Sequence, residues 1–188
     1  MKARIVPRKE IVLLYRHNEA ENGEKLIDLF KQMKLEYRLV EEKDLNKTTG
    51  ELAGYRAETQ IQEQPENCPQ MPAMALGGLS GSRLDHLLTE MNRAKIDIPV
   101  KMVITQHNEG WKFADLISEV QKEHELFLSM ERLQKTVELL KDTQDPAAKE
   151  LIQKARVALD RMKGREENQP DAEELDGIGE EIVAYLQK

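Results

Sequence analysis

Two successive strand–loop–helix segments show the clearest pattern of hydrophobic and polar positions in the chain. The first has an apolar strand over residues 72–76, a polar loop over 77–83 and a helix with leucines on one face. The second has an apolar strand over 100–104, a polar loop over 105–111 and another amphipathic helix. Open α/β sheets usually bind ligands at loops that leave the carboxyl ends of strands. These two loops are therefore the first candidate sites.

The N-terminal part of the chain predicts two further strands. Residues 11–15 form an unbroken apolar run, which is typical of a strand buried on both faces. A helix is expected to follow to about Met33, and residues 36–40 alternate in polarity as a half-buried strand does. Asp44 is suited to N-cap a weak helix through Leu52.

The order of these elements predicts the fold class. Residues 56–70 are polar and contain two prolines, so we expect a loop there. The resulting order, β-α-β-(α)-β-α-β-α, is typical of an α/β sandwich around a roughly four-stranded, mostly parallel sheet. The alternative is a thioredoxin-like fold, because Pro72 stands directly before a strand as the cis-proline of that fold does. In that alternative the third strand is antiparallel to the first.

The rest of the chain predicts a helical extension. Apolar residues at 126, 130, 133, 137 and 140 alternate spacings of four and three, which forms an a/d seam over two heptads. Asp145 and Pro146 have the order typical of an N-cap and a first helical residue. Asp171 is suited to cap a last helix after a break over 164–170. We therefore expect an α/β domain over residues 1–125, and a helical hairpin plus a short terminal helix over 126–188.

Composition narrows the classes of function. Of the 188 residues, 34 % are charged and 4 % aromatic, which indicates that part of the chain is a solvated helical appendage. The formal net charge of -7 disfavours nucleic acid and anionic membranes as partners. No apolar run approaches the roughly 18–20 residues that span a bilayer. The single cysteine, Cys68, cannot form an intramolecular disulfide, so we expect a reducing, cytoplasmic compartment.

Three polar loops would meet at one edge of the sheet if the first, third and fourth strands are neighbours and run parallel. The candidate residues for such a ligand or interaction surface are Arg16, His17 and Asn18 after the first strand, Gly77, Gly78, Ser80, Ser82 and Arg83 after the third, and Thr105, His107, Asn108 and Trp111 after the fourth. If the third strand is antiparallel to the first, this composite site does not form.

The loop over 77–83 has two interpretations. Gly77 and Gly78 allow positive φ and close backbone approach, while Arg83 stands in the first helical turn, so the loop could bind phosphate or carboxylate. However, it lacks the Lys-Ser/Thr of a Walker motif and the spacing of the GxGxxG fingerprint. The favoured interpretation is structural: the glycines form a turn and a serine caps the helix.

The loop over 105–111 is the second candidate. Asn108 is expected to N-cap the following helix, with Trp111 at its third position over the end of the sheet. A functional interpretation makes His107 an acid, base or ligand and Trp111 a stacking platform. Spacing fixes no acid or nucleophile beside His107, so the sequence shows no catalytic constellation. The four histidines have neither i,i+4 nor His-x-His spacing, so no metal and no cofactor is expected.

A family resemblance rests on the same region. Its pattern has a leucine-rich helix, a strand of the form K-x-V-x-T, and an asparagine and a tryptophan before a final helix that ends in glutamate. The matching residues are Leu84, Leu87, Lys101, Val103, Thr105, Asn108, Trp111, Leu116 and Glu123. On these residues, the segment of about 72–125 resembles a bacterial family, domain of unknown function 3783. The resemblance brings no activity, cofactor or catalytic residue.

Two hypotheses of function follow. The leading one is a non-enzymatic interaction or self-association module with a helical arm, which contacts a protein partner or a second copy through residues 126–188. The a/d seam supports it, because the seam must be buried either in an intramolecular hairpin or in a dimer. The alternative is a domain that binds a small anion or a nucleotide, or an enzyme, using the loop over 77–83.

Overall fold

The computed structural model describes residues 8–57, 65, 68–162 and 169–187. The chain divides into two compact units, residues 1–120 and 121–188, which we call the α/β unit and the helical unit. Most of the predicted loop over 56–70 and of the predicted break over 164–170 lies outside the described residues.

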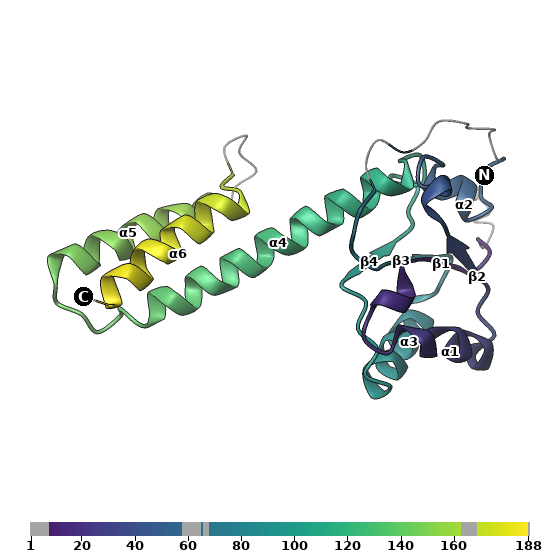
Figure 1. Cartoon of the computed structure of the whole chain (residues 1–188), viewed down its shortest axis with the longest axis horizontal. Coiled ribbons are helices and arrows are strands. Elements are labelled where there is room, and N and C mark those ends of the chain that lie inside the picture. Colours follow the sequence, from purple (N-terminus) through teal and green to yellow (C-terminus); the bar gives the residue numbers. More distant parts are fainter. Residues whose placement is uncertain (1–7, 58–64, 66–67, 163–168, 188) are drawn as a thin grey trace, which may run out of the picture. The chain divides into compact units, whose positions relative to one another are not determined.

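Four strands form one sheet in the α/β unit (Figure 1). They are β1 (Ile11–Tyr15), β2 (Tyr37–Val40), β3 (Ala73–Gly77) and β4 (Val100–Val103), in the order β2-β1-β3-β4. β1 pairs with β2 and β3 pairs with β4 in parallel, whereas β1 and β3 are antiparallel. Two of the three pairings are thus parallel, and the predicted α/β class with a four-stranded, mostly parallel sheet is confirmed.

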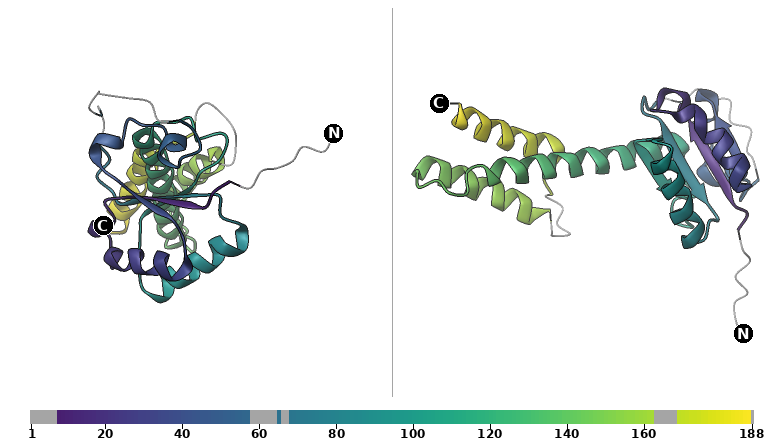
Figure 2. Two further views of the ribbon diagram at one scale, coloured as in Figure 1. Left: turned by 90° about the vertical axis from the view of Figure 1, so that its right-hand side faces the viewer. Right: turned by 90° about the horizontal axis from the view of Figure 1, so that it is seen from below.

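Helices cover both faces of this sheet (Figures 1 and 2). On one face, α1 (Leu26–Met33) and α3 (Gly81–Arg93) pack on Val12, Leu14 and the methionine and leucine of β3. On the other, α2 (Thr49–Leu52) and the start of α4 (Phe113–Glu138) pack on Leu13 and Tyr15. Alternate residues of β1 therefore enter two different cores, which is why its apolar run is unbroken.

The strand β3 begins directly after Pro72, but no peptide bond among the described residues is cis. The structure therefore agrees with the thioredoxin-like alternative in that β3 is antiparallel to β1, and differs from it in that the peptide bond before Pro72 is trans.

Short helical turns connect the main elements of this unit. They are η1 (His17–Glu19), η2 (Gly23–Lys25) and η3 (Glu42–Asp44). The prediction that Asp44 caps the helix through Leu52 is wrong, because Asp44 closes η3 by bonding back toward Glu41. The cap of α2 is Thr48, whose hydroxyl accepts from the Glu51 amide while the Glu51 carboxylate accepts from the Thr48 amide. This reciprocal capping box gives the backbone amides of both residues a hydrogen-bond acceptor at the start of the helix.

Three helices share one hydrophobic core in the helical unit (Figure 2). They are the later part of α4, α5 (Pro146–Arg161) and α6 (Ala172–Leu186). Asp145 caps α5 by accepting from Ala147 N at 2.9 Å, and Asp171 caps α6 by accepting from Glu174 N at 2.8 Å, as the sequence predicts. None of the described helices is long and apolar enough to cross a membrane.

The predicted a/d seam of α4 lies within this core. Its members Leu126, Met130, Leu133, Val137 and Leu140 pack with residues of α5 and α6. A polar cluster also joins α4 to α6, since Asp176 accepts from the buried Ser129 at 3.0 Å and from Arg132 at 2.8 Å. Of the two ways to bury the seam, an intramolecular hairpin or a dimer, the structure shows the first, because residues of the same chain pack on it.

Candidate functional site

Strand direction separates the three predicted loops. Because β3 and β4 are parallel, the loops over 77–83 and 105–111 leave the same edge of the sheet. Because β1 is antiparallel to β3, the loop over 16–18 leaves the opposite edge. The expectation that Arg16, His17 and Asn18 join the other two loops is therefore wrong.

Residues of the first loop are largely engaged within the chain. Arg16, in a left-handed conformation at φ 50°, donates to Gln70 Oε1 at 2.9 Å and lies 3.4 Å from a carboxylate oxygen of Glu42. His17 is buried, and burial lowers the pKa of its imidazole because it disfavours the charged form. Asn18 is exposed. These three residues form a loop rather than an open ligand site.

The two glycines after β3 are required by contacts inside the chain. A Cβ on Gly77 would overlap the hydroxyl of Tyr55, which donates to Lys9 O at 2.8 Å. Gly78 has φ +72°, and a Cβ there would overlap the Lys9 carbonyl. The space that a phosphate cradle would need is thus filled by the chain itself, which favours the structural interpretation of this loop.

The polar side chains of the glycine loop also have internal partners. Ser80 stands at the N-cap of α3 as predicted, but its hydroxyl accepts no cap hydrogen bond from the helix and lies 3.2 Å from that of Ser82. Arg83 donates from Nη2 to Met33 O at 3.1 Å, and its Nε lies 2.8 Å from Glu10 Oε2. The charge expected to attract an anion is therefore already paired with a carboxylate.

The loop over 105–111 forms a closed turn. The Thr105 amide donates to Asn108 Oδ1 at 2.8 Å, and the Asn108 amide donates back to Thr105 Oγ1 at 3.3 Å. Asn108 Nδ2 also donates to Val103 O at 3.0 Å. Asn108 thus closes the turn after β4, and the prediction that it N-caps the next helix is wrong because α4 begins only at Phe113.

The start of α2 and the turn after β4 are held together by hydrogen bonds to backbone carbonyls. Trp111 O accepts from the amide and the hydroxyl of Thr49 at 2.9 and 3.2 Å, and Glu109 O accepts from Gly50 N at 2.8 Å. A Cβ on Gly50 would lie 2.9 Å from Glu109 O, so this close approach requires glycine. The Phe113 amide adds a bond to Lys47 O at 3.0 Å. The turn is therefore fixed from two sides.

Glu109 organises the charges at this turn. Its carboxylate lies 2.7 Å from Arg8 Nη2 and 3.2 Å from Arg56 Nη2, and only 13 % of its side chain is exposed. Arg8 also lies over the ring of Tyr55, 5.0 Å from its centroid. Burial raises the pKa of the Tyr55 hydroxyl, which Arg8 partly offsets. Two guanidinium groups share one carboxylate, so a positive charge remains.

The outer face of the turn carries an exposed aromatic group. Trp111 is 38 % exposed and its ring centroid lies 5.6 Å from that of His107, with the planes tilted by 60°. Arg56 passes over Gly110, next to Trp111, and Lys112 is exposed beside it. We call Arg56, His107, Gly110, Trp111 and Lys112 the corner surface. Trp111 does not cover the sheet as a helical residue, contrary to the prediction.

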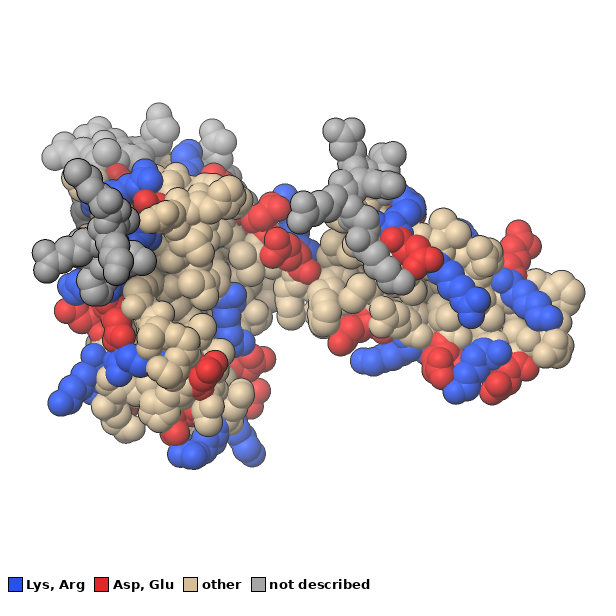
Figure 3. All heavy atoms as spheres, turned by 180° about the vertical axis from the view of Figure 1, so that it is seen from behind, with Lys and Arg blue, Asp and Glu red and all other residues tan. Residues whose placement is uncertain are grey.

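Nothing at this surface has the geometry of a catalytic site. Among the described residues, His107 forms a ring contact with Trp111 and no hydrogen bond to an acid or a nucleophile. The described residues also hold no group of three or more His, Cys, Asp or Glu side chains suited to a metal ion. Positive and negative side chains intermix over both units on the face shown in Figure 3. What the corner surface offers is an aromatic plane beside guanidinium and ammonium groups.

Sequence reasoning missed the residues that support the corner surface. Arg8, Tyr55, Arg56 and Glu109 were not identified, since they are far apart in the chain and belong to no motif. The Thr48-x-x-Glu51 capping box is the one local signal that could have located the supporting turn.

Comparison with known proteins assigns this region to a family. Residues 72–127 match Domain of unknown function (DUF3783), which confirms the resemblance stated from the sequence. The match spans β3, α3, β4 and the first part of α4, and thus includes most of the corner surface. Searches of the curated proteins and of the solved structures found no match.

Proposed function

We propose that this chain, whose residues 72–127 carry the domain of unknown function 3783, is a non-enzymatic protein-interaction module. Its α/β unit would contact an acidic partner protein through the corner surface. The observation that carries the proposal is the exposure of Trp111, which is 38 % accessible and lies on a turn that Thr49, Asn108 and Glu109 hold in place. Tryptophan and arginine are the residues enriched in the energetic centres of interfaces.

The charge and rigidity of the corner surface support this kind of partner. Arg8 and Arg56 pair with the single carboxylate of Glu109, and Lys112 is exposed beside Trp111, so the surface is locally positive on a chain of net charge -7. An acidic segment of a partner protein fits this local positive charge. Because the turn is fixed before binding, little conformational entropy is lost when a partner docks. A cytoplasmic location is part of the same proposal and rests on the lone Cys68.

The alternative of an anion or nucleotide site in the loop over 77–83 has weaker support. Gly77 and Gly78 accommodate Tyr55 and Lys9, and Arg83 is paired with Glu10. The glycine loop therefore offers an anion neither the backbone space nor the free charge that such a site uses.

Covalent capture with matched variants tests the proposal. Full-length wild-type chain, Trp111→Ala and Leu39→Ala are crosslinked in an extract and the captured proteins identified. Leu39 is a suitable control because it is 49 % exposed and lies on β2, at the far side of the sheet from β4. The proposal expects an acidic protein captured by wild type and by Leu39→Ala and lost with Trp111→Ala. The same set of captured proteins for all three chains would contradict it.

A further inference from the structure

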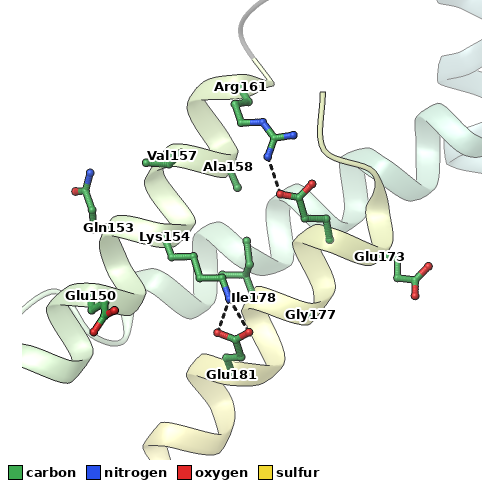
Figure 4. Close-up of a pocket in the computed structure, with 11 residues that line it drawn as sticks. Glu150, Gln153, Lys154, Val157, Ala158, Arg161, Glu173, Gly177, Ile178 and Glu181 are labelled. Atoms are coloured by element: carbon green, nitrogen blue, oxygen red, sulfur yellow. Dashed lines mark hydrogen bonds and ion pairs between the residues drawn. The ribbon is translucent and has the colours of Figure 1, made fainter. Parts of the chain in front are cut away.

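A groove of about 550 Å³ runs between α5 and α6 in the helical unit (Figure 4). Val157 lines it and is 51 % exposed, and Gly177 lines it from α6. A second groove of about 510 Å³ between the same helices shares Glu150, Lys154 and Glu181 with the first. The two grooves adjoin at the Lys154–Glu181 ion pair, and we call them together the α5/α6 groove. From Ala147 to Arg161 it follows α5 for about 21 Å at 1.5 Å per residue.

Gly177 keeps this groove open, although nothing inside the chain requires glycine there. A Cβ at Gly177 would meet no heavy atom within 4 Å, and its φ is not positive. Glycine within a helix is less stabilising than alanine, so its presence needs another reason. Gly179 is equally unconstrained, but it lines a different groove, between α4 and α6. The two glycines thus form a matched pair for an experiment.

The groove is negatively charged. Its lining carries four glutamates, at positions 150, 173, 174 and 181, and two basic residues. The two basic groups of the lining, Lys154 and Arg161, pair across the groove with Glu181 at 2.6 Å and with Glu174 at 2.7 Å (Figure 4). Among the described residues, Glu150 and Glu173 of the lining bond to no other side chain. These two carboxylates remain available to a positively charged partner.

We propose that the α5/α6 groove binds a basic amphipathic helix of a partner protein. Helices that dock into grooves place apolar side chains at spacings of three and four against the groove. Val157 and the open space over Gly177 would receive this apolar face, while lysines or arginines of the partner would reach Glu150 and Glu173. A helix of about 14 residues matches the length of the groove. This site is independent of the corner surface, since it lies in the other unit and takes a partner of opposite charge.

The probe is a fluorescent peptide of about 14 residues, made of leucine and lysine with the leucines on one helical face. Its binding to the full-length chain is measured by fluorescence anisotropy. We expect Gly177→Leu to weaken binding by at least about tenfold, because the leucine fills the groove. Gly179→Leu is the control and should bind within about twofold of wild type. Both variants are first checked by circular dichroism, and both should fold because a Cβ at either position meets no heavy atom within 4 Å.

Three results would overturn the proposal. The first is equal affinity of the Gly177→Leu and Gly179→Leu chains for the peptide. The second is equal binding of a peptide in which glutamate replaces every lysine, since the glutamates at 150 and 173 should repel it. The third is a dimer of the chain alone, seen by light scattering and lost in Gly177→Leu, which would assign the groove to a second copy.

Discussion

The role of Gly77 can be tested by a double-mutant cycle with Tyr55. In Gly77→Ala the new Cβ would overlap the Tyr55 hydroxyl, so the ring must move and its bond to Lys9 O is disturbed. Overpacking costs about 1–3 kcal/mol and a lost hydrogen bond about 0.5–1.5 kcal/mol, while replacing glycine returns about 0.5–1 kcal/mol. We therefore expect Gly77→Ala to lower the free energy of unfolding by about 2–3 kcal/mol.

Tyr55→Phe removes the atom that causes the overlap. Alone, this substitution should lower the free energy of unfolding by about 1 kcal/mol, because it removes the hydrogen bond to Lys9 O. Combined with Gly77→Ala it should recover part of the loss, because the nearest remaining atoms, Tyr55 Cζ and Ile11 Cγ2, both lie 3.1 Å from the Cβ position. The double variant should thus be more stable than the sum of the single effects predicts, by at least about 1 kcal/mol.

Urea unfolding followed by tryptophan fluorescence measures each member of this cycle. Trp111 is the only tryptophan and lies in the α/β unit, so the signal reports that unit. Additive losses, within about 0.5 kcal/mol, would refute the reasoning. They would show that Tyr55 does not explain the glycine, and the ligand interpretation of the loop would regain support.

Three further predictions concern pH and the helical unit. Burial lowers the pKa of His17, so the unfolded chain binds more protons than the folded chain, and the stability that the neutral imidazole contributes is lost as pH falls below about 6.5. In urea titrations, wild type should therefore lose more stability than His17→Gln between pH 7.5 and pH 5.5. Equal losses in the two chains would refute this. Asp176→Ala removes the carboxylate that accepts from Ser129 and should lower the free energy of unfolding of the helical unit by about 1 kcal/mol. Urea unfolding followed by circular dichroism at 222 nm measures this, and an unchanged midpoint would show that the polar cluster does not stabilise the unit. Gly177→Ala and Gly179→Ala should each stabilise that unit by about 0.5–1 kcal/mol in the same assay, and destabilisation would mean that their surroundings are not open.

Local signals predicted most of the elements. The strand Ile11–Tyr15 is recognisable because both of its faces are buried, which leaves no polar position in the run. Asp145 and Asp171 cap their helices because the cap interaction lies within three residues of the chain. Residues 72–127 match a family model for a related reason, since the residues that carry the resemblance lie in one contiguous segment.

The arrangement of the site could not be predicted because it depends on contacts between distant residues. Hydrophobic periodicity shows that a strand exists and not which way it runs, so the antiparallel pairing of β1 and β3 was open. The ion pair of Arg8 with Glu109 joins residues near the two ends of the sequence of the α/β unit. Asn108 could equally cap a helix or close a turn, and the hydrogen bonds to Thr105 decide for the turn.

Fluorine NMR of Trp111 in the complex tests most directly whether the corner surface contacts the partner. The chain labelled with 5-fluorotryptophan carries one fluorine, because it has one tryptophan. After the protein captured by crosslinking is purified, it is added to the labelled chain and the fluorine NMR signal is followed. We expect a saturable change in the chemical shift or line width of the fluorine signal, because the partner covers a ring that is exposed in the free chain. A signal that stays unchanged while the complex forms would contradict the corner surface as the site of contact.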